Sequence, residues 1–271
     1  MAERDYVLGT HDDEVNRLGL QHRAWRPRVL DAWARARIGE GASVIDFGAG
    51  PGFATIDLAE IVGPGGAVHA LERSQRFLGV LKARAAGQGL RNIQAYEVDV
   101  AADALPVGGA DAAWVRWVFA FLAEPRAALE KLARAIKPGG ALVIFEYLHY
   151  RTLGLRPRSE SFDHFVDEVV ANWRASGGDP DVGRSLPHWL CELGFSLESV
   201  RPHIDIVAPG DTMWRWPESF FQLHIDRLIE LERIAKAEGD AMRAQFARDA
   251  AQPGARMVTP LVVEIIARKS A

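Results

Sequence analysis

The sequence predicts an α/β fold built on a doubly wound, mostly parallel sheet. Three observations support this prediction: short apolar runs alternate with helical runs, a glycine-rich turn follows the first apolar run, and 48% of the 271 residues are hydrophobic. A chain of this size and composition can bury one substantial core together with an accessory subdomain.

The most informative segment is a βαβ unit between Ser43 and Glu72. Its strand, helix and second strand cover, in order, residues 44–47, 54–62 and 67–71. The turn after the first strand has glycine at alternate positions, namely Gly48, Gly50 and Gly52. Glycines in such a turn let bare backbone approach a nucleoside-like ligand, and a carboxylate placed like Glu72 can accept hydrogen bonds from both ribose hydroxyls.

Two kinds of cofactor could use this turn. A dinucleotide site needs G-x-G-x-x-G, whose last glycine lets helix and strand pack closely. That position is Phe53 here, and we expect its ring to wedge helix and sheet apart. The run DFGAGPG at residues 46–52 instead resembles motif I of the class I S-adenosylmethionine (SAM)-dependent methyltransferases. This resemblance implies SAM as the cofactor, held by Asp46, the three glycines and Arg73, with Glu72 at its ribose.

The resemblance continues in order to about residue 147. In the family, an acid at the end of the third strand, or the backbone beside it, holds the adenine amino group, and Asp99 and Val100 match that position. Residues 111–118 resemble the fourth strand, which ends beneath the methionine part of SAM. Arg116 lies in this strand, where it could pair with the SAM carboxylate or with an acid of residues 202–255, or simply reach past the strand end; we favour the first. The run LARAIKPGGALVIFEY resembles the fifth-strand block.

The resemblance implies a Rossmann-like domain of seven strands in the order 3-2-1-4-5-7-6, with the last strand antiparallel. We expect this domain to cover residues 41–201 and 256–271. A helical cap at residues 1–40 precedes it, and a helical insertion at residues 202–255 forms a lid, because so long a connection inside a compact domain is usually a functional element.

Two helices are expected in the cap. Thr10 can begin the first, which ends near Arg23, and Pro27 can begin the second. Such caps cover the cofactor in many family members, which would bring Tyr6, His11, Arg17 or Gln21 near the methionine end of SAM. Each of these side chains could instead simply pack or solvate its helix.

Aromatic residues predict the nature of the methyl acceptor. Trp214 and Trp216 in the lid, and Tyr150 after the fifth strand, are candidates for the wall of the acceptor pocket. Several lid aromatics also recur at helical spacing, so simple core packing stays open as an alternative. An aromatic wall favours a flat or apolar metabolite over a sugar phosphate.

Two histidines are candidates for a general base. His149 follows the fifth strand at the carboxyl edge, where open α/β sheets bind ligands, and His224 lies in the lid. Either could equally be an ordinary polar residue. SAM already carries an excellent leaving group, so the protein mainly aligns and desolvates the reactants, and a base helps only some acceptors.

The resemblance therefore implies transfer of a methyl group from SAM to an oxygen, nitrogen or carbon atom of a small molecule, with release of S-adenosylhomocysteine (SAH). Two other interpretations remain open. One is a SAM-binding protein without catalysis, and the other is a dinucleotide-dependent oxidoreductase.

Composition excludes several classes of partner. The net charge is −4 without long runs of like charge, which argues against nucleic acid, and no apolar run approaches the ~20 residues that span a bilayer. The eight histidines lack metal-site spacing, so we expect no metal.

Cys191 is the only cysteine, and we expect it to be buried. Because the chain can form no intrachain disulfide, it suits the cytoplasm. The cap or the lid could support a homodimer.

Overall fold

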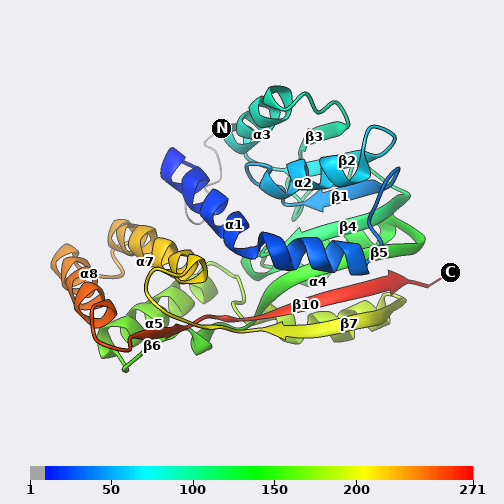
Figure 1. The fold of residues 1–271 in the computed structure, drawn as a ribbon. Coiled ribbons are helices and arrows are strands. Elements are labelled where there is room, and N and C mark those ends of the chain that lie inside the picture. Colours follow the sequence, from blue (N-terminus) through cyan, green and yellow to red (C-terminus); the bar gives the residue numbers. More distant parts are fainter. Residues whose placement is uncertain (1–9, 271) are drawn as a thin grey trace.

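A seven-stranded sheet is the centre of the fold in the computed structural model, which describes residues 10–270 (Figure 1). Its strands are, in chain order, β1 Ser43–Phe47, β2 Ala67–Glu72, β3 Ile93–Glu97, β4 Ala110–Arg116, β5 Ile136–His149, β7 Phe195–His203 and β10 Leu261–Lys269. Their order across the sheet is β3-β2-β1-β4-β5-β10-β7. The first five strands are parallel, and β10 runs antiparallel to both of its neighbours. This order confirms the prediction, because β7 and β10 are the expected sixth and seventh strands.

Helix α1 (Asp12–Arg35) crosses one face of the sheet (Figure 1). The rings of Trp33 and Trp114 meet edge to face with centroids 5.2 Å apart, and those of Trp25 and Phe145 do so at 6.0 Å. All four side chains are buried, so these contacts fix α1 against β4 and β5. The remaining helices of the domain are α2 Phe53–Val62, α3 Gln75–Gly87, α4 Pro125–Ala135 and α6 Leu186–Glu192.

α1 is a single helix where the sequence predicted two. Pro27 lies inside it, and His11 rather than Thr10 is its N-cap. A proline removes one backbone donor and usually kinks a helix, but packing on both sides can hold the helix together. Here Pro27 is exposed, while Trp25 and Val29 on either side of it are buried in the core.

Three further helices gather at one end of the sheet (Figure 1). They are α5 Glu160–Ala175, α7 Thr212–Glu230 and α8 Lys236–Ala250. Their interface is aromatic, since the ring of Phe221 lies 4.7 Å from that of Phe165 and 4.6 Å from that of Phe246. The helical insertion expected at residues 202–255 therefore contains α7 and α8.

A small second sheet was not predicted. It contains β6 Gly154–Arg156, β8 Ile206–Val207 and β9 Arg256–Val258, in the order β6-β9-β8. Strands of two or three residues are too short to show a hydrophobic period in the sequence. The short 3-10 helices are η1 Phe119–Phe121, η2 Tyr150–Thr152 and η3 Val182–Arg184.

Two statements from composition can be compared with the structure. Cys191 is exposed, not buried as predicted, because the short α6 turns Leu186 and Leu190 inward and leaves Cys191 on its outer face. Within residues 10–270, no helix is both long enough and apolar enough to cross a lipid bilayer.

Candidate cofactor and acceptor site

A cavity lies at the carboxyl edge of the sheet, between the glycine turn and α1. Its wall comes from α1, the turn after β1, the ends of β2 and β4, and the segments that follow β3 and β4. Ligands of open α/β sheets bind at this edge. The predicted cofactor residues on the wall are Asp46, Gly48, Gly50, Glu72, Arg73, Asp99, Val100 and Arg116. Of the predicted cofactor residues, Gly52 alone is not among the described residues that line this wall.

The glycine turn requires glycine for two different reasons. Gly48, Gly50 and Gly52 all have positive φ, at 78°, 56° and 82°, a backbone conformation that other residues rarely adopt. A Cβ on Gly48 would lie 2.5 Å from Val118 Cγ2, and one on Gly52 would overlap the side chain of Leu81. No atom of the described residues lies within 4 Å of a Cβ built on Gly50, so the backbone there faces open space in the cavity.

Glu72 joins the end of β2 to the glycine turn. Its Oε2 accepts a hydrogen bond from the Gly50 N–H at 2.9 Å, and its Oε1 accepts one from the Ser74 N–H at 2.8 Å. Burial raises the pKa of Glu72, against the opposing effect of these two donors. Each carboxylate oxygen can accept more than one hydrogen bond, so Glu72 can still accept from two hydroxyl groups in the cavity.

Asp99 and Val100 form the wall after β3. Oδ1 of Asp99 accepts from the Ala101 N–H at 2.9 Å, and the Asp99 N–H donates to Asp103 Oδ2 at 2.9 Å, which fixes a tight turn. Val98 and Val100 are buried beside it and also line the cavity. This part of the wall therefore combines apolar surface with one carboxylate.

Asp46 and Arg116 bring opposite charges to the cavity floor. Asp46 is buried, accepts a hydrogen bond from the Thr55 hydroxyl at 2.6 Å, and has its pKa raised by burial to about 6. Burial lowers the pKa of Arg116 to about 10, so its guanidinium stays charged at neutral pH. Arg116 Nη2 lies 3.4 Å from Nδ1 of His22, while Nη1 is buried and has no hydrogen-bond partner within residues 10–270.

Trp117 begins the apolar part of the wall, and sequence reasoning missed it. It follows β4 with φ of 51°, which is uncommon for a bulky residue. Its ring is stacked on Tyr147 at 5.5 Å and on Trp216 at 5.2 Å, and its backbone N–H donates to the Phe145 carbonyl at 3.0 Å. Apolar side chains continue this wall, namely Leu18, Phe53, Val118, Phe121 and Leu122.

Gln21 connects this wall to α7. It lies on α1 and lines the cavity, and its Oε1 accepts hydrogen bonds from Arg17 Nη1 at 3.0 Å and Trp216 Nε1 at 3.1 Å. Trp216 therefore supports the wall from behind, through Trp117 and Gln21.

The predicted substrate residues are not on the wall of this cavity as the structure describes it. Trp214 is buried against Phe246 at 6.0 Å, and Trp216 lies one layer behind. Tyr150 is buried between Tyr147 and Trp173. Core packing accounts for these rings, because residues of α8, α1 and α5 pack against Trp214, Trp216 and Tyr150 in turn. Tyr6 lies outside the described residues.

Neither candidate base is among the described residues that line the cavity. The His149 side chain is 43% exposed, with Nδ1 2.9 Å from Arg184 Nη2 and 3.8 Å from Asp181 Oδ1. His224 is buried, stacks on Phe220 at 4.7 Å, and has no hydrogen-bond partner for either ring nitrogen in the described part of the chain. Burial lowers the pKa of His224 to about 3. A base role for either histidine stays a prediction that this geometry does not support.

Phe53 disfavours a dinucleotide site for a reason other than the one predicted. Its ring does not wedge α2 from the sheet, since it points toward α1. It is stacked on His22 at 5.9 Å, and a Cβ on Gly19 would lie only 2.7 Å from its Cζ. The Arg84 guanidinium lies 4.0 Å from the ring centroid. Phe53 therefore fills the space between the glycine turn and α1.

Known proteins resemble this chain in both sequence and fold. A family model described as a methyltransferase domain matches residues 44–140. A demethylmenaquinone methyltransferase of Lactococcus lactis is 30% identical over 131 residues, which are 48% of this chain and 50% of that protein. A ubiquinone/menaquinone biosynthesis C-methyltransferase of Coxiella burnetii is 28% identical over 194 residues, 71% of each chain. A solved structure of a putative methyltransferase from Bacillus halodurans superposes with a TM-score of 0.59 at 17% identity, covering 89% of this chain and 98% of that one.

The chain spans about half the length of the first curated relatives that it matches. The matched segment runs from β1 through the start of β5 and contains the glycine turn, Glu72, Asp99 and Arg116. In the described part of the chain, no group of three or more His, Cys, Asp or Glu side chains is placed to hold a metal ion. The strand order, the cavity at the carboxyl edge and these matches support a class I SAM-dependent methyltransferase.

Proposed function

We propose that this protein transfers a methyl group from SAM to a small aromatic or apolar molecule and releases SAH. The observation that carries this proposal is the division of the cavity into two kinds of wall. One part presents the carboxylates of Glu72 and Asp99 and the cation of Arg116, and the other is formed by Trp117 and other apolar side chains. The first suits a nucleoside with a charged amino-acid tail, and the second suits an apolar acceptor.

The described residues fit SAM group by group. Glu72 can accept from the ribose hydroxyls, and Asp99 and Val100 can flank the adenine. The unpartnered Nη1 of Arg116 offers a charge-assisted donor for the carboxylate of the methionine part. The open space at Gly50 leaves room for the chain between ribose and carboxylate. When bound, SAM would supply the methyl group from its sulfonium, and the sulfur would be left as the thioether of SAH.

The apolar wall defines what the acceptor must be. Trp117, Phe121 and Leu122 offer flat, apolar contact, so they can align an aromatic acceptor and exclude water from it. The named relatives act on demethylmenaquinone or in ubiquinone and menaquinone biosynthesis. A quinol is therefore the acceptor class that we propose first, with phenols and aromatic amines next.

Proton removal from the acceptor is proposed to be independent of His149. Its side chain is solvent-exposed and engaged with Arg184, and it does not border the described cavity. We expect His149→Ala to keep turnover within about twofold. A loss of about tenfold or more would restore the base role, since general-base catalysis typically contributes about 10²–10⁴-fold.

The proposal is tested by a methyl-transfer screen with labelled SAM against quinols, phenols and amines. We expect label in at least one product and a matching release of SAH. Isothermal titration of SAM and of NADH serves as the binding control, with SAM expected to bind and NADH not. Tight NADH binding without SAM binding would overturn the proposal in favour of an oxidoreductase.

A second candidate is a SAM-binding protein without catalysis. The observation in its favour is the close packing of the lid, where Trp214, Trp216 and Phe221 are buried and leave their rings no access to the cavity. This candidate predicts SAM binding without turnover for every acceptor in the screen. The cytoplasmic location and the homodimer stay expectations from the sequence.

A further inference from the structure

His22, Asp57 and Arg116 form a connected set that the proposed function does not yet use. They come from three elements that meet only through the fold, namely α1, α2 and β4. His22 Nε2 lies 3.0 Å from Asp57 Oδ2, and His22 Nδ1 lies 3.4 Å from Arg116 Nη2. His22 and Asp57 are buried, and Arg116 lines the cavity.

The hydrogen-bond roles in this set follow from chemistry. A guanidinium has only donors, so Nδ1 of His22 must be the acceptor in its contact with Arg116. Nε2 therefore carries the proton and donates to Asp57, which leaves His22 neutral. Asp57 is held in turn by Arg26, whose Nε donates to the same Oδ2 at 2.8 Å.

One nitrogen of the Arg116 guanidinium is left without a partner among the described residues. Nη2 is held by His22, and the guanidinium lies 5.3 Å from the centroid of the Trp117 ring. Nη1 is buried and without a partner in the described part of the chain, although it belongs to a side chain on the cavity wall. A buried cationic donor is costly to leave unpaired, which points to an anionic group of a ligand as its partner.

We propose that the His22–Asp57 pair is a positioning unit that aims Arg116 at the carboxylate of the methionine part of SAM. The inference rests on the proposed function, since it concerns the same cofactor. It also gives the cap helix a specific role in cofactor binding. Because His22 lies on α1 and stacks on Phe53, the carboxylate anchor is complete only when α1 covers the glycine turn.

The experiment compares two ligands that differ at the group in question. SAH carries the carboxylate, whereas 5′-methylthioadenosine has the same adenosine and sulfur without it. We expect His22→Phe, which keeps a ring over Phe53 but removes the acceptor, to weaken SAH binding about tenfold in isothermal titration. Binding of 5′-methylthioadenosine should change by less than about twofold, because its contacts do not include Arg116.

Two further variants separate positioning from folding. His22→Asn keeps an acceptor near the place of Nδ1 and should restore most of the SAH affinity. Asp57→Asn removes the carboxylate that orients His22, and should weaken SAH alone by about threefold. His203→Asn is the matched control, since His203 also contacts α1 and lies 3.0 Å from a buried carboxylate, that of Glu264, away from the cavity. This control variant should bind SAH and 5′-methylthioadenosine as tightly as the original protein does.

The outcomes distinguish this inference from the proposed function. Equal weakening of both ligands in His22→Phe and Asp57→Asn, or no weakening of either, would overturn the positioning role while SAM binding stands. If the unaltered protein bound neither ligand, the cofactor assignment itself would fail, and the positioning role with it.

Discussion

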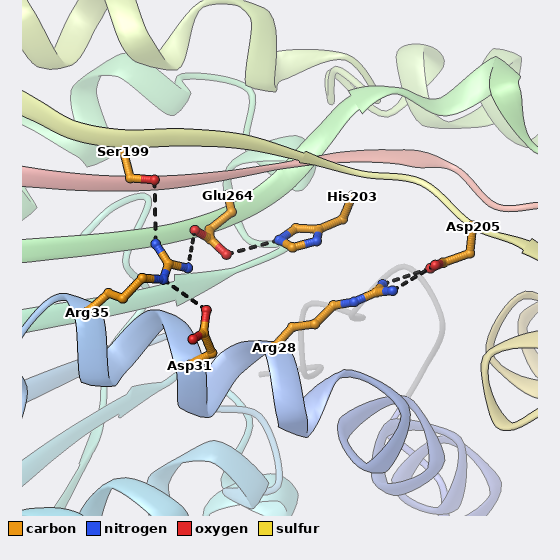
Figure 2. Close-up of polar contacts among 7 residues, drawn as sticks. All are labelled: Arg28, Asp31, Arg35, Ser199, His203, Asp205 and Glu264. Carbon is orange, nitrogen blue, oxygen red and sulfur yellow. Dashed lines mark hydrogen bonds and ion pairs between the residues drawn. The ribbon is translucent and has the colours of Figure 1, made fainter.

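The two halves of α1 are attached to the rest of the molecule in different ways. The carboxyl-terminal half, residues 27–35, is fixed to the antiparallel edge of the sheet by ion pairs, as Figure 2 shows. Arg28 pairs with Asp205 through two hydrogen bonds of 2.7 and 2.8 Å, and Arg35 donates to Glu264 at 2.6 Å. His203 Nε2 lies 3.0 Å from the second oxygen of Glu264.

The amino-terminal half, residues 12–26, contacts the parts that form the site. Leu18 and Gln21 line the cavity, and His22 reaches toward Asp57 and Arg116. The comparison shows that one half anchors the helix to the scaffold and the other completes the site. Substitutions in the amino-terminal half should therefore weaken cofactor binding, whereas those in the carboxyl-terminal half should change stability alone.

The largest expected effect comes from Arg17→Met in the amino-terminal half. Arg17 and Glu14 are 5% and 0% exposed, and two hydrogen bonds of 2.6 and 2.7 Å join them. Removing one partner of a buried pair leaves an uncompensated charge and should cost about 3–5 kcal/mol in urea unfolding. SAH should also bind more weakly, because Gln21 loses its hydrogen bond from Arg17. An unchanged dissociation constant for SAH in the folded variant would remove this half from the site.

Glu264→Gln tests the carboxyl-terminal half. The substitution leaves Arg35 and His203 with a weaker acceptor, which should lower the free energy of unfolding by about 1–3 kcal/mol. SAH affinity should not change, since none of these residues lines the described cavity. Weaker SAH binding in this variant would contradict the division between the two halves.

The same variant has a pH signature. Burial alone would raise the pKa of Glu264, but the hydrogen bonds from His203 and Arg35 bring it below its usual value of 4.5. A carboxylate with a lowered pKa stabilises the fold above the pKa of the unfolded state and loses this contribution as pH falls below it. The stability difference between the original protein and Glu264→Gln should therefore be constant from about pH 5 to 8 and shrink below about pH 4.5.

Mild acid should release the amino-terminal half first. Burial lowers the pKa of His22 below 6.5, and the nearby Arg116 and Arg26 act in the same direction, against Asp57. A histidine kept neutral by the fold costs stability as pH falls below 6.5, by at most about 1.4 kcal/mol per pH unit. Hydrogen exchange at pH 7.5 and 5.5, corrected for intrinsic rates, should show lost protection at residues 12–26 and little change at residues 27–35. His22→Asn should abolish the difference, and a uniform response along α1 would contradict it.

Much of the fold could be predicted because its signals are local. The glycine turn, the alternating strands and helices, and Glu72 and Asp99 at strand ends are all visible in short runs of sequence. The structure brings these residues to one cavity, as the strand order requires.

The acceptor side could not be predicted because it depends on contacts between distant segments. Trp117 joins the wall through a positive φ at the end of β4, and Trp216 is withdrawn behind it by stacking and by Gln21. His22 gains its role only where α1 passes over α2, 35 residues away in the chain. Helical spacing identified the lid aromatics correctly as helix-borne, but spacing cannot decide whether a ring faces a core or a cavity.

The smallest expected effect is that of Pro27→Ala, at the junction of the two halves. Proline in a helix interior leaves one carbonyl without its helical donor, and Pro27 is exposed, so alanine can restore that bond without disturbing the core. The gain is partly offset because alanine makes the unfolded chain more flexible, and we expect a net stabilisation of about 1 kcal/mol. In hydrogen exchange, the two halves should then open together, because the break in the backbone ladder is gone. If they still open separately, the ion pairs of Figure 2, and not the proline, divide the helix.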